Sequence, residues 1–372
     1  MAFWVGRLNT PIHTLKNPFY LFRFQSGVEH LSFGSNNNLY HMKRIRQPFK
    51  IVSIMSLTVL FLTSCSNDDE DEDLGNWVDR SVFDGSPRSG ASSFTIGNTG
   101  YIALGYDGDD YLNSVWAYDM DGDFWSQKAD FPGVARNAAV GFEIDGTGYV
   151  GSGYDGLDEL GDFYSYNPSA NTWAEIASLS TTTRRSAVAF GINGFGYFGT
   201  GYDGENDRKD FWKYDPSTDS WSELVGFGGD KRRAATTFTI GNNVYLGTGV
   251  SNGSYLDDFW VFDSTTETWT SKLDLDEEDD YSITRSNAVG FTISGYGYIA
   301  CGELGGTATS VWQYDPSDDT WEEKTNFEGA SRQDPIAFSN SSRAFVGLGR
   351  TGSLYLDDFD EFFPFEEYDE DD

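Results

Sequence analysis

Residues 136–173 read RNAAVGFEIDGTGYVGSGYDGLDELGDFYSYNPSANTW, and this stretch decides the fold. It shows no helical periodicity. Asp-Gly and Asn-Pro pairs, which favour tight turns, divide it into short runs rich in aromatic and β-branched residues. The runs are Ala138 to Ile144, Tyr149 to Gly153, Asp162 to Tyr166 and Trp173 to Ile176. We therefore predict a sheet of four short strands joined by turns.

The same unit recurs along the chain, mostly at steps of 48 residues. Each copy has an arginine, a phenylalanine six residues later, a further aromatic ring and a tryptophan, and such a fixed period is typical of repeat architectures. The inserted segment Leu273 to Tyr281 lengthens one step. The four series are Arg88, Arg136, Arg184, Arg232, Arg285 and Arg332; Phe94, Phe142, Phe190, Phe238, Phe291 and Phe338; Tyr101, Tyr149, Tyr197, Tyr245, Tyr298 and Phe345; and Trp77, Trp125, Trp173, Trp221, Trp269 and Trp321.

Six such sheets can cover one another if they are arranged radially, whereas one alone cannot bury both of its faces. Aromatic residues make up 16% of the chain, enough to fill the interfaces between sheets. The last unit reaches Leu356 to Phe362 but lacks its tryptophan strand, which Trp77 can supply from the other end. We predict an all-β fold, a six-bladed β-propeller over residues 77–363, with the last blade closed by the N-terminal strand around Trp77. An open array of β-units is the alternative.

Three features of the repeat resemble the kelch family over residues 77–363. They are the Tyr-Asp-Pro of the third strand, at 214–216 and 314–316, the tryptophan that follows it, and a glycine after the second strand. The glycines are Gly105, Gly153, Gly201, Gly249, Gly302 and Gly349. The resemblance implies a kelch-type propeller. Gly-Tyr-Asp-Gly at 105–108, 153–156 and 201–204 replaces the glycine doublet of the family, which we expect to change a loop and not the fold.

The N-terminal region carries the signals of a secreted protein. Residues 42–64 have a basic start, a 12-residue apolar stretch from Ile51 to Leu62 and a small-residue end, as a signal peptide does. That stretch is well short of the roughly 20 residues that a spanning helix needs. Leu62-Thr63-Ser64-Cys65 resembles the lipobox of bacterial lipoproteins, which implies that Cys65 is the lipid attachment site. Residues 1–41 show no pattern and are interpreted as a non-native upstream extension or an unstructured segment.

The acidic residues that follow Cys65 indicate an extracytoplasmic location. Residues 65–76 resemble the short tethers that send lipoproteins to the outer face of the outer membrane, although a solvated linker is the other interpretation. We expect an outer-membrane protein that faces the cell exterior, with the periplasmic face as the alternative. Residues 364–372 are predicted to be an acidic tail. Residues 65–372 carry 18 − 58 = −40 charges, which excludes nucleic acid as a partner.

Residue types that are missing restrict the chemistry. The three histidines, His13, His30 and His41, all precede the signal peptide, so the mature domain has no imidazole. The copper chemistry of galactose oxidase, which shares kelch repeats, and Ser-His-Asp catalysis are therefore excluded. Cys301 is the one cysteine left besides Cys65, so no disulfide joins two residues of the propeller. We predict no cofactor, and we favour a protein that is not an enzyme.

Arginine offers a planar fork to carboxylates and sugar hydroxyls, so the arginine series is the candidate ligand-binding set. In a four-stranded blade these residues begin the innermost strand and share one face of the disc with the acidic second-to-third-strand loops. A structural role, in which each arginine bonds loop carbonyls and carboxylates, is the competing interpretation. The candidates are Arg88, Arg136, Arg184, Arg185, Arg232, Arg233, Arg285 and Arg332.

The acidic loops at 107–110 and 274–280 are rich in oxygen ligands that suit calcium, but neither matches the EF-hand pattern. We therefore predict no specific metal site, although calcium binding by these loops stays open. The predicted function is a monomeric, non-catalytic binding module for a glycan or protein. The alternative, a sugar epimerase that uses carboxylates and arginine, follows from the resemblance to kelch-type mutarotases.

Overall fold

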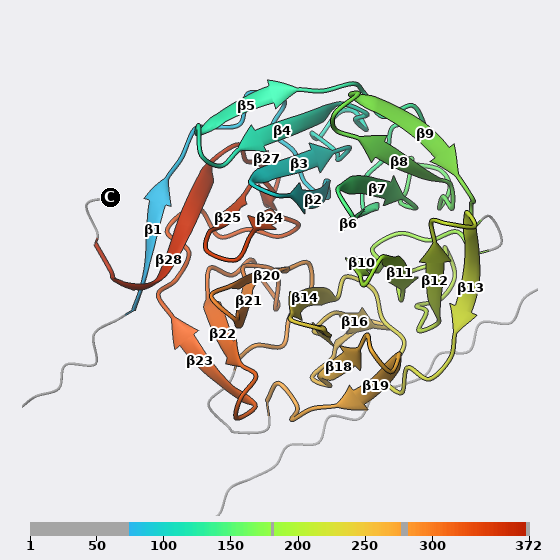
Figure 1. Cartoon of the computed structure of the whole chain (residues 1–372). Coiled ribbons are helices and arrows are strands. Elements are labelled where there is room, and N and C mark those ends of the chain that lie inside the picture. The colour runs from blue at the N-terminus through green and yellow to red at the C-terminus, as the bar shows by residue number, and fades with distance from the viewer. Residues whose placement is uncertain (1–73, 180–181, 277–281, 370–372) are drawn as a thin grey trace, which may run out of the picture. The chain divides into compact units, whose positions relative to one another are not determined.

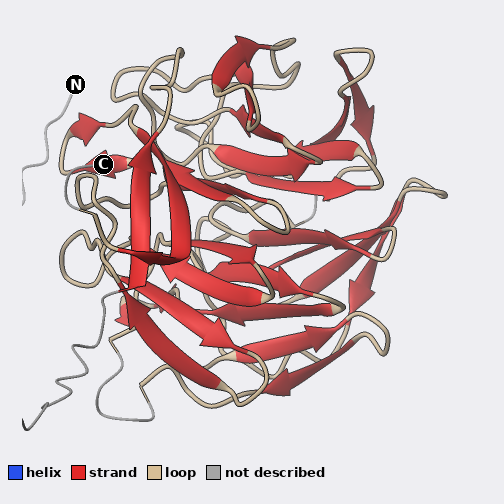
Figure 2. Ribbon diagram, turned by 60° about the vertical axis from the view of Figure 1, so that its left-hand side comes forward, coloured by secondary structure: helices blue, strands red, loops and turns tan. Residues whose placement is uncertain are grey.

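The computed structural model describes residues 74–179, 182–276 and 282–369, and these residues form six four-stranded antiparallel sheets around a central channel (Figure 1). The predicted all-β, six-bladed propeller is confirmed. Figure 2 shows strands and loops without a helix, and within the described residues no helix could span a membrane. The predicted signal peptide, Cys65 and residues 65–73 lie outside the described residues.

Each of blades 1 to 5 is a meander whose strands run in sequence order from the channel outward. Blade 1 is β2 Ser92–Ile96, β3 Thr99–Ala103, β4 Val115–Asp119 and β5 Phe124–Gln127; blade 2 is β6 Val140–Ile144, β7 Thr147–Gly151, β8 Phe163–Asn167 and β9 Thr172–Ile176; blade 3 is β10 Val188–Ile192, β11 Phe195–Gly199, β12 Phe211–Asp215 and β13 Ser220–Leu224. Blade 4 is β14 Thr236–Ile240, β15 Asn243–Gly247, β18 Trp260–Asp263 and β19 Thr268–Ser271; blade 5 is β20 Val289–Ile293, β21 Tyr296–Ala300, β22 Val311–Asp315 and β23 Thr320–Lys324.

Blade 6 is built from both ends of the described chain, as predicted. Its strands are β24 Ile336–Ser339, β25 Ala344–Gly347, β28 Phe359–Glu367 and, outermost, β1 Leu74–Asp79. Trp77 pairs with Phe362, the two rings stack with centroids 4.4 Å apart, and Trp77 is only 1% exposed. In Figure 1 the blue β1 lies along the red β28.

The blade-6 strands are longer than the sequence analysis predicted. Leu74 is already paired with Glu367, so β1 takes up the end of the segment assigned to the acidic tether. By the same pairing, β28 extends through residues 364–367, which were assigned to the acidic tail. The register between the two strands, rather than the change to acidic composition, sets where the propeller ends.

Blade-to-blade packing explains the glycines of the second strands. Phe94 stacks on its cross-strand partner Tyr101, and its ring lies against Gly148 of the next blade. A Cβ on Gly148 would stand 2.3 Å from that ring, so only glycine fits there. Gly196 and Gly297 face Phe142 and Phe238 in the same way. These second-strand glycines are thus required by the packing of one blade on the next.

The ring is also closed by backbone hydrogen bonds between neighbouring blades. The N–H of the glycine after each second strand donates to the carbonyl of the aligned arginine of the next blade, at 2.7–2.9 Å. The series begins with Gly105 to Arg136, and it ends with Gly349 to Arg88, which joins blade 6 to blade 1. Every blade is therefore fixed to its two neighbours by the same contact.

The closure contains a buried acid that generates a prediction about pH. Asp360 of β28 is 4% exposed and lies opposite Asp79 of β1. Burial, reinforced by a hydrogen bond with Asp79 and by the charge of Asp358, raises the pKa of Asp360 to about 8. An unfolded aspartate has a pKa of about 3.9, so the folded state binds this proton more tightly. The contribution of Asp360 to stability is therefore fully present below about pH 4 and is lost as the pH rises toward 8.

We expect Asp360→Asn to raise the melting temperature at pH 8 by about 2–4 °C, the shift that about 1 kcal/mol produces in a large domain. The gain should shrink as the pH approaches 4, because the native carboxyl is then protonated. Thermal melts from pH 4 to 9 measure both trends. Asp357→Asn, at an exposed neighbouring position, is the control and should keep the wild-type profile. Parallel profiles for wild type and Asp360→Asn would contradict the assignment.

Candidate functional site

The six aligned arginines begin the inner strands on one side of the disc, which we call the arginine face. All are 0–2% exposed. Arg136 shows the arrangement: its Nε donates to Val134 O at 2.7 Å, and Nη1 donates to Ser152 O at 3.1 Å. Its Nη1 and Nη2 donate to the two carboxylate oxygens of Asp162 at 2.5 and 2.8 Å. The guanidinium thus joins the connection that enters its blade to the end of the second strand.

This geometry corrects the ligand-binding assignment of the aligned series. Their guanidinium groups are buried and bonded to backbone carbonyls, so the aligned series does not form a ring of exposed cations on the arginine face. In four blades the carboxylate partner stands 26 residues after the arginine, a spacing visible in the sequence that we had not recognised as a pair. The corrected residues are Arg88, Arg136, Arg184, Arg232, Arg285 and Arg332, and the partners are Asp162, Asp210, Asp258 and Asp358.

The arginine face carries a second repeated structure, in which the backbone is constant and the side chains vary. In each blade three residues are joined by backbone β-bridges, and we call these three residues the rungs. They are the residue after the aligned arginine, the residue after the glycine that follows the second strand, and one residue four or five places further on. From blade 1 to blade 6 these rungs are Ser89, Tyr106 and Tyr111; Asn137, Tyr154 and Glu159; Arg185, Tyr202 and Asp207; Arg233, Val250 and Tyr255; Ser286, Glu303 and Thr307; and Gln333, Arg350 and Tyr355.

Side chains of these rungs form a continuous tyrosine–arginine arc across five blades. It is made of Tyr355, Tyr106, Tyr111, Tyr154, Arg185, Tyr202 and Arg233. Neighbouring tyrosine rings have centroids 4.9–6.1 Å apart. The arc therefore presents aromatic rings alternating, at one end, with guanidinium groups.

Arg185 and Arg233 differ from the aligned series because their side chains are 33% and 35% exposed. Arg185 lies over Tyr154, 4.4 Å from the ring centroid, and Arg233 lies 5.0 Å from the centroid of Tyr202. These are cation–π distances. Two of the eight predicted arginines are thus placed on an accessible surface, together with tyrosines that the sequence analysis did not select.

Carboxylates hold the two arginines in place. Arg233 Nη1 donates to Asp207 Oδ1 at 2.7 Å, and the other oxygen of Asp207 accepts the N–H of Asn252 at 2.8 Å. Asp207 is 4% exposed, so this pair is partly shielded from solvent. Arg185 lies 3.6 Å from Glu159. The arc is therefore a preorganised surface that offers rings, guanidinium edges and two carboxylates.

At the centre of the arginine face, six backbone hydrogen bonds form a closed ring around the channel. Each runs from the N–H of the residue two places after an aligned arginine to the carbonyl of its counterpart in the preceding blade. All six residues have φ between 50° and 60°. The ring is Gly90, Ala138, Ser186, Ala234, Asn287 and Asp334.

Asp334 is the acidic member of this ring. Its side chain is 28% exposed, with Arg350 Nε 3.7 Å from Oδ2. Loss of hydration in the narrow channel mouth raises the pKa of Asp334, and the charge of Arg350 only partly offsets this effect.

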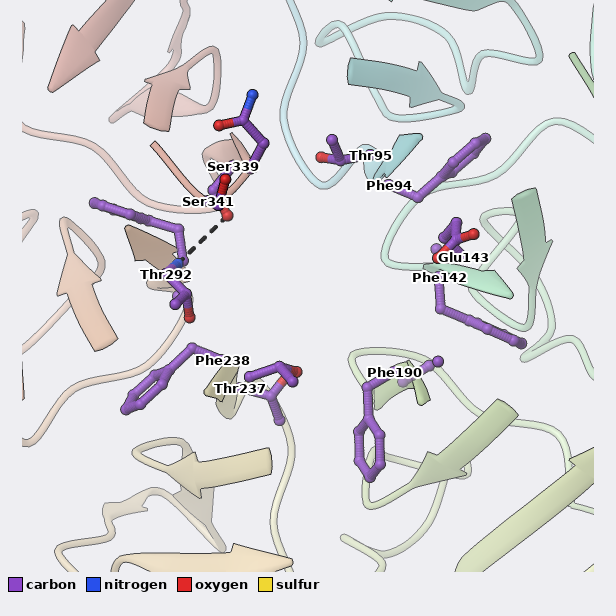
Figure 3. Close-up of a pocket in the computed structure, with 17 residues that line it drawn as sticks. Phe94, Thr95, Phe142, Glu143, Phe190, Thr237, Phe238, Thr292, Ser339 and Ser341 are labelled. Carbon is purple, nitrogen blue, oxygen red and sulfur yellow. Dashed lines mark hydrogen bonds between the residues drawn. The ribbon is translucent and has the colours of Figure 1, made fainter. Parts of the chain in front are cut away.

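The channel itself is a cavity of about 440 Å³ lined by the inner strands. Figure 3 shows small polar side chains such as Thr95, Thr237 and Ser341 around the space, while the rings of Phe94 and Phe142 point away into the blades. Glu143 is the charged residue of this lining, and its carboxylate accepts the N–H of Gly146 in its own hairpin. The channel wall therefore lacks the converging pair of titratable groups that acid–base catalysis uses.

The acidic loops of blades 1 to 3 use their first aspartate to bond their own backbone. Asp107 Oδ1 accepts the N–H groups of Asp109 and Asp110 at 3.0 and 2.8 Å. Asp155 repeats this bonding, which holds its pKa below the usual value. No group of metal-ligating residues occurs in the part of the chain that the structure describes, which omits residues 277–281 of the second acidic loop.

Comparison with known proteins agrees with this geometry. A sequence model of the Kelch motif matches residues 87–132, which contain the first aligned arginine and the whole of blade 1. The chain is a kelch-type β-propeller. The solved structure of YjhT is similar to it, with a TM-score of 0.65 and 18% identity over 75% of this chain and 96% of that one. No curated protein sequence matches. At this identity the likeness shows the fold alone, because a propeller of this type can serve unrelated functions.

The two kinds of arginine in this kelch propeller make a paired prediction. Arg184→Ala should lower the free energy of unfolding by about 3–5 kcal/mol, because it removes the charged partner of Asp210 and the donor to two carbonyls. Arg185→Ala, one residue later, should change it by less than about 1 kcal/mol. Urea unfolding of the two variants and the wild type measures the difference. Equal losses would contradict the separation into frame and surface arginines.

Proposed function

We propose that this propeller is a binding module without chemistry of its own and that it holds a glycan or protein partner on the tyrosine–arginine arc. We further propose that a lipid on Cys65 anchors it to the outer membrane, facing the cell exterior. The observation that carries the proposal is the arc itself. Tyrosine and arginine are the residue types that contribute most at binding hot spots, because they give a large contact area and retain a polar handle.

Charge supports the arginine face over the rest of the surface. The chain has a net charge of −34, yet Arg185, Arg233 and Arg350 gather on this face. The acidic surface repels a carboxylate-bearing ligand, whereas these guanidinium groups attract it to the arginine face. The tyrosine rings add a flat apolar surface, suited to a sugar ring or a partner side chain.

One observation favours the alternative, a kelch-type sugar epimerase. Asp334 combines a raised pKa with a nearby arginine, the environment expected of an acid–base residue. Epimerisation needs a second group to take or supply the other proton. A candidate on the neighbouring rungs is Glu303, whose charge contributes to the raised pKa of Asp334.

We expect the double variant Arg185→Glu, Arg233→Glu to reduce capture of a surface glycan or protein by at least about 10-fold, since a loss of about 1.4 kcal/mol suffices for that factor. Capture can be measured on glycan arrays and with extracts of the host surface. Because Arg233→Glu removes the partner of the buried Asp207, the melting temperature is expected to fall, so capture is compared well below it, where the variant is folded.

The matched control is Lys209→Glu, Lys231→Glu, which makes the same charge change at exposed positions beside a hollow of about 850 Å³ at the rim of blade 3. Loss of capture in this control, with the arc variant unaffected, would move the site to the rim. If the wild-type protein accelerates anomer exchange of reducing sugars, followed by NMR, and Asp334→Asn abolishes that acceleration, the epimerase replaces the binder.

The anchor has its own test. In a host that processes lipoproteins, the wild-type chain should enter the membrane fraction with the added mass of a diacylglycerol, and Cys65→Ser should not. Cys301→Ser changes the other cysteine, which is fully buried in blade 5, and should leave anchoring intact. Membrane association of Cys65→Ser with an unmodified mass would contradict the lipid anchor.

A further inference from the structure

Blade 1 departs from the arginine–aspartate frame. Four aligned arginines pair with an aspartate of their own blade, but in blade 1 the position 26 residues after Arg88 is Ser114. The first blade thus keeps the buried cation and lacks the built-in anion.

In blades 3 and 4 the aspartate receives hydrogen bonds from two side chains. Arg184 Nη2 and Trp212 Nε1 both donate to Asp210 Oδ2, each at 2.8 Å. Asp258 receives the same two donations, from Arg232 and from Trp260 Nε1. The guanidinium and the indole therefore define the position of one carboxylate.

Blade 1 retains both donors. Arg88 is 1% exposed, and it donates from Nε to Ser86 O and from Nη1 to Leu104 O, each at 2.9 Å. It makes no ion pair with any described residue. Trp116 Nε1, the counterpart of the indoles of blades 3 and 4, is buried and has no hydrogen-bond partner. Burial without a carboxylate partner lowers the pKa of Arg88 to about 10, and distant Asp107 compensates only in part.

Blade 1 also retains the glycine that borders the carboxylate. The residue three places before the arginine is Gly229 in blade 4 and Gly329 in blade 6, and a Cβ on either would lie 2.9 Å from the Oδ2 of Asp258 or Asp358. At the equivalent Gly85 the three nearest atoms are two of the Phe83 ring and, at 2.9 Å, Trp116 Nε1, with no carboxylate oxygen among them. The four aspartate side chains are 25–39% exposed, so the position they occupy borders solvent.

Blade 5 shows how a serine can complete the frame without an anion. Arg285 also faces a serine, but its Nη2 donates to Ser310 Oγ and to Ser282 O, both at 2.9 Å. Its Nη1 donates to two further carbonyls. The guanidinium of Arg285 therefore has an acceptor for each of its N–H groups, whereas Arg88 donates two hydrogen bonds only among the residues that the structure describes.

We propose that blade 1 binds a small carboxylate anion from solution, of the size of formate or acetate, between Arg88 and Trp116. The anion takes the place of the aspartate carboxylate found in blades 2, 3, 4 and 6 and completes the frame of the first blade. This site is separate from the tyrosine–arginine arc and does not depend on the proposed function.

The test is a titration of the full chain, labelled with 15N-tryptophan, with sodium formate at constant ionic strength set by sodium chloride, because sulfate would itself stabilise the folded state. The indole signal of Trp116, assigned with Trp116→Phe, should shift and saturate, and the melting temperature should rise with formate. Ser114→Asp should abolish both responses and raise the melting temperature in the absence of formate.

Two further variants keep the test decisive. Ser114→Ala adds no carboxylate to blade 1, so it should retain the formate response even if Ser114→Asp fails to fold. Ser310→Asp places the same carboxylate in blade 5 and should also retain the response. A Trp116 signal that does not saturate, or that shifts equally in Ser114→Asp, would overturn the proposal.

Discussion

The structure depends on a buried arginine at the start of each inner strand. Its side chain joins two segments of its own blade, and its carbonyl accepts the N–H of the glycine in the preceding blade, as with Arg136 and Gly105. Each arginine thus stabilises its own blade through its side chain and the contact with the preceding blade through its backbone carbonyl. A buried guanidinium is costly to desolvate, and it is stable only where its bonds are complete. This requirement explains why the arginine, the turn that supplies its first carbonyl, and the strand end that supplies its second recur together.

The same connection holds strained backbone in place. Residues with positive φ, such as Ala138 and Ala234, cost about 1–2 kcal/mol each outside glycine. Here each such residue donates to one blade and accepts from another, so the closed ring around the channel mouth fixes a conformation that a single blade could not maintain. Closure by β1 and β28 completes this mutual support, because an open array would leave one member of the ring without a donor.

The sequence predicts the frame well and the site only in part. Trp, Arg, Phe and Tyr at a fixed period give the number of blades, and the missing last tryptophan strand identifies Trp77 as the closing residue. The period also led to the assignment of the aligned arginines as ligand-binding residues. A residue that recurs in every blade instead serves the structure that all blades share. The aligned arginines are therefore frame residues, while Arg185 and Arg233, which break the pattern, reach the surface. The distance from Arg136 to Asp162 in the chain could have revealed the pair, but the tyrosine arc depends on which loops the ring brings together.

Departure from the repeat is thus the feature that marks function in this molecule. The rungs of the arginine face share one backbone bridge pattern, so their side chains can differ without changing the fold. Tyrosines and arginines collect on consecutive blades, and this grouping makes one extended surface instead of six separate contacts. Ser114 is a departure of the opposite kind, since it removes a partner from the frame itself. A different side chain on a rung leaves the arginine–aspartate frame intact. A different residue at a frame position, as at Ser114, leaves a buried arginine without a carboxylate partner in the described part of the protein. The two departures therefore carry different proposals: the first concerns a ligand on the protein surface, and the second couples the stability of the first blade to the anions around it.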